Sequence, residues 1–169
     1  MKIFLIGLMG SGKSFLGKKI SKSIQLPFLD LDVEIEKQEE LSVSKIFSTK
    51  GKEYFRTIEA AALRKQGEAK EFVMATGGGT PCFHDNMNFI KQAGTSIFLD
   101  TPMKEILKRL NGPQKDRRPL LQVVLGDEVE QTLEKMLENR LPFYEKADFT
   151  VNGATVTAWD ILQLLHTKK

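Results

Sequence analysis

The sequence predicts an α/β fold with three layers, α/β/α, around a central five-stranded parallel sheet. Five short apolar runs have the length of strands, and segments with helical spacing of apolar residues separate them, an order typical of parallel strands covered on both faces. These runs span residues 2–6, 28–32, 72–75, 96–99 and 149–151. The first four lead into glycine-rich loops or end in aspartates, so ligand-binding residues are expected along one edge of the sheet.

The first strand is followed by Gly7-Leu8-Met9-Gly10-Ser11-Gly12-Lys13-Ser14, which matches the G-x-x-x-x-G-K-[ST] phosphate loop. Its glycines let successive backbone N–H groups point inward, and the helix that follows adds a positive N-terminal dipole. Lys13 can reach the β- and γ-phosphates of a nucleotide, and the Ser14 hydroxyl can bind Mg²⁺. A glycine-rich turn that binds nothing is the alternative, but the strand before the loop and the helix after it favour nucleotide binding.

The front half of the chain alternates helices with loops. A helix is expected over about residues 12–23, and a polar helix over 33–40. Ser42 is placed to cap a short helix, which Gly51 separates from a longer one over about 53–66. The second strand, 28–32, ends in two acids, so Leu29 and Leu31 are expected to face the core.

The back half contains a glycine loop and four further helices. Residues 76–81 cannot form regular structure, and helices are expected over about 85–92, 103–110, 129–141 and 158–165. Pro102 is expected at the first position of the 103–110 helix. Thr157 and Asp160 have the spacing of a capping box for the last helix.

Length and composition point to one soluble domain over residues 1–169. The single cysteine, Cys82, excludes an internal disulfide and suits a reducing compartment, which we take to be the cytoplasm. No apolar run has membrane-spanning length, so no membrane contact is expected. The net charge is only +3, without a basic block that alternates with aromatic residues, so no nucleic-acid partner is expected either. No feature demands a partner surface, and a monomer is the default.

Three aspartates compete for roles at the strand ends. Asp30 and Asp32 would point the same way on an extended segment, where one could hold Mg²⁺ and the other accept a proton from an attacking hydroxyl. A pair of solvated acids, or a helix cap, explains the same spacing. Asp100 ends the fourth strand as a metal-binding acid would, but Asp100-Thr101-Pro102 also reads as a helix cap, and capping is the preferred interpretation.

Four arginines and one glutamate complete the set of candidates. Arg56 and Glu59 lie three residues apart on one helix face, where an exposed ion pair is the plain alternative. Arg140 borders an apolar stripe and needs a carboxylate, a phosphate or a helix end as partner, unless its head lies in water. Arg117 and Arg118 lie in the proline- and glycine-containing stretch of about 111–126, which reads as a mobile lid that can bring an arginine over transferring phosphate.

These motifs in this order resemble the shikimate kinase family of P-loop kinases. The likeness covers essentially the whole chain and rests on the phosphate loop and five further elements. These are Asp30-Leu31-Asp32, Phe55-Arg56-Thr57-Ile58-Glu59, Gly77-Gly78-Gly79, Arg118-Pro119-Leu120-Leu121 and the Arg-x-x-x-Tyr of residues 140–144. The resemblance implies a P-loop kinase domain with a substrate-binding segment at about 32–60.

The resemblance also implies a role for each matching residue. ATP would be bound by Gly10, Ser11, Gly12, Lys13, Ser14, Phe15, Arg109 and Arg118. Shikimate would be bound by Asp32, Phe47, Phe55, Arg56, Glu59, Gly77, Gly78, Gly79 and Arg140. Ser14 and Asp30 would hold Mg²⁺, Asp32 would act as the base, Lys13 and Arg118 would assist catalysis, and Arg109 would stack on adenine. Arg118 is chosen over Arg117 because it directly precedes a proline.

The expected reaction is Mg²⁺-dependent transfer of the ATP γ-phosphoryl group to the 3-hydroxyl of shikimate, in aromatic amino-acid biosynthesis. Two arginines suit the carboxylate of this small acid, and an aspartate near its hydroxyls supplies a proton acceptor. A kinase for gluconate or a nucleoside monophosphate is the nearest alternative, because such kinases resemble the front of the chain. They need not carry the Arg56 and Arg140 pair together with Gly77–Gly79. A non-catalytic nucleotide-binding module is the alternative from another class.

Overall fold

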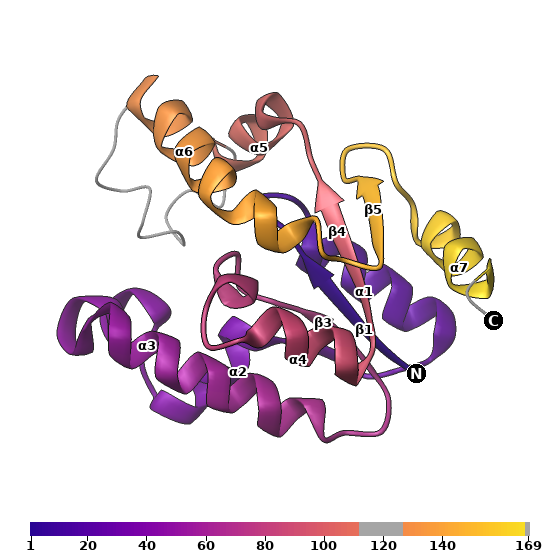
Figure 1. Cartoon of the computed structure of the whole chain (residues 1–169), viewed down its shortest axis with the longest axis horizontal. Coiled ribbons are helices and arrows are strands. Elements are labelled where there is room, and N and C mark those ends of the chain that lie inside the picture. Colours follow the sequence, from indigo (N-terminus) through magenta and orange to yellow (C-terminus); the bar gives the residue numbers. More distant parts are fainter. Residues whose placement is uncertain (112–126, 168–169) are drawn as a thin grey trace.

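The chain folds around a five-stranded parallel sheet with helices on both faces (Figure 1). The structure, a computed structural model, describes residues 1–111 and 127–167. The strands are β1 (Lys2–Ile6), β2 (Phe28–Asp30), β3 (Phe72–Ala75), β4 (Thr95–Asp100) and β5 (Phe149–Asn152). They lie in the order β2-β3-β1-β4-β5, and every neighbouring pair is parallel. The predicted α/β/α fold with a five-stranded sheet is therefore confirmed.

The helices divide between the two faces because alternate residues of each strand point to opposite sides. They are α1 (Lys13–Ile24), α2 (Leu31–Glu39), α3 (Val43–Gly67), the 3₁₀ turn η1 (Thr80–Cys82), α4 (Asn86–Ala93), α5 (Met103–Leu110), α6 (Asp127–Tyr144) and α7 (Ala158–Thr167). Ile3 and Leu5 of β1 pack with α1 and α7. Phe4 and Ile6 pack on the other side with α2, α3, α4 and α6.

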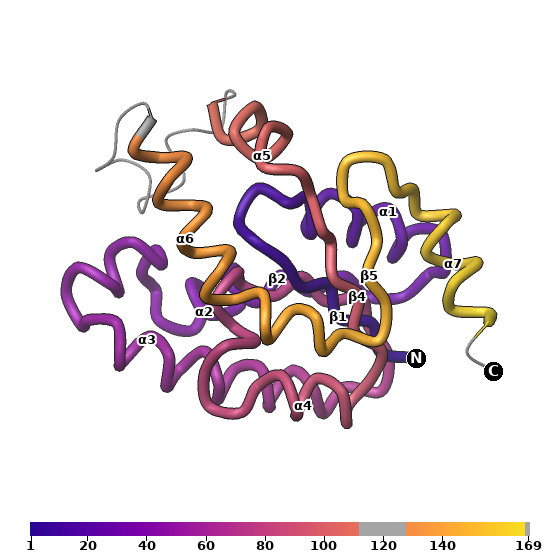
Figure 2. Tube along the Cα trace, turned by 45° about the horizontal axis from the view of Figure 1, so that its top comes forward, coloured from indigo at the N-terminus to yellow at the C-terminus, as the bar shows by residue number. Residues whose placement is uncertain are grey.

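Helices α5 and α6 lie near each other on one side of the molecule (Figure 2). A smaller apolar cluster packs both helices against the phosphate loop. Leu8 of the loop packs with Ile106 and Leu110 of α5 and with Leu133 of α6, and all four side chains are buried. Two helices that come late in the chain are thus placed against its first loop. No helix in the described ranges has the length and apolar character needed to cross a membrane.

Several local predictions are confirmed. The Ser42 side chain accepts a hydrogen bond from the Lys45 amide and so caps α3. Gly51 interrupts that helix with φ 83° and ψ 171°, which turns its first two turns away from the rest. Thr157 and Asp160 form the predicted capping box: the Thr157 amide donates to Asp160, and the Asp160 amide donates back to the Thr157 hydroxyl.

Two predictions at strand ends are wrong. The second strand ends at Asp30, and helix α2 begins at Leu31, so Asp32 lies in the first turn of a helix instead of on an extended segment. Asp100 does not cap α5. That helix begins at Met103, its N-cap residue is Pro102, and no side chain there accepts a capping hydrogen bond. The Asp100 backbone carbonyl instead accepts a hydrogen bond from the Gly153 amide.

Candidate active site

The phosphate loop encloses its own lysine. Gly12 has φ 102°, and a Cβ atom there would lie 3.1 Å from Nη1 of Arg109, so both the backbone and the neighbouring arginine require glycine. The buried Lys13 ammonium donates to the Gly7 carbonyl at 2.8 Å and the Leu8 carbonyl at 2.9 Å. A compact positive charge is thereby held inside the loop, where a β- or γ-phosphate would bind.

Ser14 and Asp30 meet as the metal prediction requires. The Ser14 hydroxyl, on the first turn of α1, donates to Oδ2 of Asp30 at the end of β2 over 2.6 Å. A hydroxyl and a carboxylate are the hard oxygen ligands that suit Mg²⁺, which usually takes few protein ligands and completes its shell with phosphate oxygens and water. This pair of side chains therefore fits a magnesium ion bound together with nucleotide.

Asp32 reaches the site from α2, although it was expected on a strand. Its carboxylate lies against the triple-glycine loop: a Cβ atom on Gly77 would lie 2.9 Å from Oδ1 of Asp32. Burial raises the pKa of Asp32 from 3.8 to about 7, the negative charges of Asp30 and Glu59 act in the same direction, and Lys13 partly opposes them. Asp32 can therefore exchange a proton near neutral pH, as a general base must.

The triple-glycine loop after β3 lies against both arginines that were expected to bind the acceptor, Arg56 and Arg140. A Cβ atom on Gly78 would lie 3.1 Å from Nη1 of Arg140 and 3.2 Å from the backbone nitrogen of Met9 in the phosphate loop. One on Gly79 would lie 2.8 Å from Cζ of Arg56. Only residues without a side chain allow two arginines and the phosphate loop to approach one backbone segment so closely. Arg56 and Arg140 are thus brought together, as predicted.

Arg56 is held on one side and has donor capacity left. Its guanidinium is buried, and Nη1 donates to Oε2 of Glu59 over 2.6 Å, so the predicted pair is a buried ion pair and not an exposed one. Its Nε–H has no hydrogen-bond partner within the described ranges. A buried donor without a partner is costly, and an anionic oxygen of a ligand would remove that cost.

Aromatic rings surround the same guanidinium. The Phe47 and Phe55 rings stack with centroids 4.5 Å apart, so the two predicted pocket residues lie together beside Arg56. Cζ of Arg56 is 5.3 Å from the Phe55 ring centroid and 4.4 Å from that of Phe83. The sequence indicates no role for Phe83, because a single aromatic residue after the glycine loop carries no spacing signal.

Tyr144 is a second residue to which the sequence assigned no role. It is fully buried one helical turn after Arg140, and its hydroxyl donates to the Gly78 carbonyl. Burial raises the pKa of Tyr144, so this hydroxyl keeps its proton and remains a donor. The four-residue spacing between Arg140 and Tyr144 was the available signal, because it places both side chains on one face of α6.

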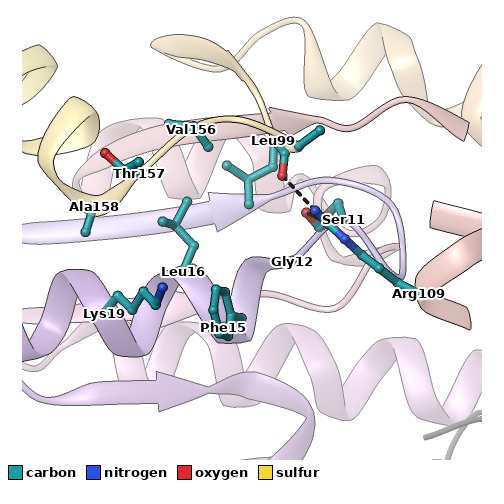
Figure 3. Close-up of a pocket in the computed structure, with 12 residues that line it drawn as sticks. Ser11, Gly12, Phe15, Leu16, Lys19, Leu99, Arg109, Val156, Thr157 and Ala158 are labelled. Carbon is teal, nitrogen blue, oxygen red and sulfur yellow. Dashed lines mark hydrogen bonds between the residues drawn. The ribbon is translucent and has the colours of Figure 1, made fainter. Parts of the chain in front are cut away.

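Arg109 lines a pocket of about 410 Å³ together with Ser11 and Gly12 of the phosphate loop (Figure 3). Its Nη1 donates to the Ser11 carbonyl at 2.9 Å, and Nη2 donates to the Gly153 carbonyl at 3.2 Å. Phe15 of α1 lines the pocket, as does the segment 153–158 that leads from β5 into α7. An arginine plane and an aromatic ring are stacking surfaces for a nucleobase, so the two predicted ATP contacts share one cavity.

The remaining predicted contacts divide into two groups. Gly10 and Ser11 lie in the phosphate loop beside Arg109, where their carbonyls accept hydrogen bonds from its guanidinium. The expected lid of about 111–126 lies, apart from Asn111, outside the described residues, and so do Arg117 and Arg118.

Comparison with known proteins agrees with this geometry. The model of the shikimate kinase family matches residues 9–167. A shikimate kinase of Bacteroides fragilis is 41% identical over 149 residues, which are 88% of this chain and 83% of that protein. One of Aquifex aeolicus is 40% identical over 153 residues, which are 90% of this chain and 87% of that protein.

Two solved structures that resemble this chain with high TM-scores are also those of shikimate kinases. Shikimate kinase of Bacteroides thetaiotaomicron superposes with a TM-score of 0.94 at 34% identity, covering 98% of each chain. The Acinetobacter baumannii enzyme in complex with shikimate superposes with a TM-score of 0.90 at 35% identity, covering 99% of this chain and 94% of that one. A gluconokinase of Sinorhizobium meliloti shares only the fold, with a TM-score of 0.56 at 16% identity. The chain therefore belongs to the shikimate kinase family.

Proposed function

We propose that this chain is a shikimate kinase, which transfers the γ-phosphoryl group of ATP to the 3-hydroxyl of shikimate and releases ADP and shikimate 3-phosphate. The observation that carries the proposal is the loop Gly77–Gly79, against which Arg56, Arg140 and the phosphate loop all pack. This loop joins a site for a small anionic acceptor to a site for a nucleotide phosphate.

Positioning and charge account for most of the proposed mechanism. Arg56 and Arg140 bind the acceptor carboxylate, since guanidinium groups can donate two parallel hydrogen bonds to it. Asp32 accepts the proton of the attacking hydroxyl. The hydroxyl oxygen forms a bond to the γ-phosphorus while the bond from that phosphorus to the β–γ bridging oxygen breaks, and ADP leaves.

The donor side neutralises the developing negative charge. Lys13 and the backbone amides of the phosphate loop bind the β- and γ-phosphates. Ser14 and Asp30 would hold Mg²⁺, which when bound supplies charge neutralisation at the same phosphates. Phe15 and Arg109 would contact the base of ATP. We further propose that the chain acts as a single-domain monomer in the cytoplasm, which size-exclusion chromatography with light scattering and cell fractionation would test.

Shikimate-dependent release of ADP tests the function. In a coupled assay with ATP and Mg²⁺, turnover is expected with shikimate and not with gluconate or nucleoside monophosphates. Asp32→Asn should nearly abolish turnover and leave ATP affinity largely unchanged, because the variant keeps the shape of the side chain and loses the base. Turnover with another acceptor in place of shikimate would refute the specificity, and full activity of Asp32→Asn would refute the base.

A non-catalytic nucleotide-binding module is distinguished by the same measurements. It would bind ATP, show no acceptor-dependent turnover and have no need for Asp32. Among the residues that the structure describes, Nε of the buried Arg56 has no hydrogen-bond partner. This favours the kinase, because a module that binds nucleotide alone has no use for a second anion site.

A further inference from the structure

A line of buried hydrogen bonds lies behind Arg56. Glu59, which is fully buried, uses both carboxylate oxygens: Oε2 accepts from Nη1 of Arg56, and Oε1 accepts from the Thr80 hydroxyl, each over 2.6 Å. A buried carboxylate needs such partners for each oxygen, because removing it from water is otherwise costly. Thr80 is therefore, with Arg56, one of the two side chains that hold the Glu59 carboxylate in place.

Thr80 is itself held at its backbone. It is fully buried, begins η1 directly after the triple-glycine loop, and donates its amide to the Gly77 carbonyl at 3.1 Å. Its carbonyl accepts from Nδ2 of Asn86 at 2.9 Å, and Oδ1 of Asn86 accepts from Nη1 of Arg64 at 2.8 Å. Asn86 is also fully buried. This continuous path connects the surface of α3 and α4 to the guanidinium of Arg56.

The hydrogen bond from the Thr80 hydroxyl determines how the Glu59 carboxylate faces Arg56. Thr80 binds Oε1 and thereby orients the Glu59 carboxylate so that only Oε2 accepts a hydrogen bond from Arg56 among the bonds of the described residues. Nε of Arg56 then has no protein partner in the described ranges and remains available to a ligand. Without the hydroxyl, Glu59 could rotate and bind the guanidinium with both oxygens, a common arrangement for this pair. The donor capacity of Arg56 toward the acceptor would fall.

We propose that Thr80 is a positioning residue for the acceptor side of the site, acting through Glu59 to keep the Arg56 guanidinium open to the carboxylate of the substrate. Asn86 fixes the backbone from which Thr80 acts. The proposal rests on the proposed function, because it concerns the binding of shikimate by Arg56. It predicts an effect on the acceptor and none on the nucleotide.

Two matched pairs of residues at position 80 isolate the hydroxyl. Threonine and valine have nearly the same shape, and serine and alanine differ only by the oxygen. Thr80→Val and Thr80→Ala are expected to raise KM for shikimate about tenfold or more, the usual size of a lost hydrogen bond to a charged group. Thr80→Ser should stay within about threefold of the wild type, because it retains that bond. The KM for ATP should not change in any variant.

Each outcome decides between the alternatives. An unchanged KM for shikimate in Thr80→Val and Thr80→Ala overturns the proposal, and so does a Thr80→Ser variant as impaired as Thr80→Ala. A rise of both KM values together with a lowered Tm assigns Thr80 a purely structural role. Should Thr80→Val fail to fold, the serine and alanine pair still decides. A wild type without shikimate-dependent turnover would instead refute the proposed function, and this inference with it.

Discussion

Asp32 illustrates how the surroundings of one carboxyl group determine when it can act. Burial, together with the charges of Asp30 and Glu59, raises the pKa of Asp32 to about 7. The carboxylate is the form that accepts a proton, so kcat/KM for shikimate should fall as the pH drops through about 7. A pH–rate profile of the wild type tests this. An acidic limb near the ordinary pKa of 3.8 would show that the pKa of Asp32 is not raised in the active enzyme.

The same raised pKa has a consequence for stability. An acid whose pKa is raised by folding favours the folded state while it is protonated, and this stabilisation is lost between its unfolded pKa of 3.8 and its folded pKa of about 7. Asn cannot ionise and avoids the loss. Without ligands, Asp32→Asn should therefore have a higher Tm than the wild type at about pH 8, with a difference that shrinks toward about pH 4. A difference that does not vary with pH would contradict the assignment.

Gly79 has no room for a side chain, because the guanidinium of Arg56 lies against it. Its backbone, at φ −93° and ψ −12°, accepts any residue, but a Cβ atom would lie 2.8 Å from Cζ of Arg56. Gly79→Ala must therefore displace the guanidinium, and KM for shikimate should rise by about tenfold or more while KM for ATP stays constant. Steady-state kinetics with each substrate varied in turn measures both. An unaffected KM for shikimate would place Arg56 outside the acceptor site.

At the scale of elements, α3 depends on the break at Gly51. The kink turns the first part of the helix so that Phe47 stacks on Phe55, beside Arg56. With φ 83° and ψ 171°, the backbone there is one that other residues adopt at a cost of about 1–3 kcal/mol. Gly51→Ala should lower the free energy of unfolding by that amount, although its Cβ would meet no atom within 4 Å. Urea denaturation measures the loss, and an unchanged midpoint would mean that the kink relaxes.

The elements that could be predicted from the sequence are those whose signals are local. The phosphate loop, the Ser42 cap and the capping box of Thr157 and Asp160 each depend on residues a few positions apart, and each forms as predicted. The prediction of a strand over 28–32 was wrong because two apolar spacings overlap there. Leu29 and Leu31 have the two-residue spacing of a strand, whereas Leu31 and Ile35, both buried, have the four-residue spacing of a helix. The helix begins one residue after the strand ends, and short apolar runs do not distinguish the two periods.

Sequence motifs named residues that the structure brings together in the candidate site, but they did not indicate the contacts between these residues. Family motifs named Arg56, Glu59 and Arg140, but no motif indicated that Thr80 bonds to Glu59 across 21 positions or Tyr144 to Gly78 across 66. Such contacts depend on the pairing of β3 with β1 and on the packing of Tyr144 of α6 in one apolar cluster with side chains of both strands. They are decided by tertiary packing, which local patterns do not encode.

At the scale of the whole molecule, the phosphate loop lies between two sets of contacts that share no residue. On the donor side Arg109 of α5 holds the carbonyls of Gly10, Ser11 and Gly153. On the acceptor side Arg140 of α6 lies against Gly78, which also lies close to the Met9 and Gly7 backbone of the phosphate loop. The sheet order places β1 and its loop centrally. In the proposed function the nucleotide and the acceptor would meet there, each bound by its own arginine.

Separate contacts predict separate effects. Arg109→Met should raise KM for ATP and leave KM for shikimate unchanged, and Arg140→Met should do the reverse, each by about tenfold or more. In the double variant each KM should rise by the same factor as in its own single variant, because residues without shared partners contribute independently. Lys108→Met, which removes an exposed charge next to Arg109, serves as the control and should change neither constant. A KM in the double variant that departs clearly from the value in the corresponding single variant would mean that the arginines act as one unit through the phosphate loop. The two half-sites would then be coupled, and the acceptor could not bind independently of the nucleotide.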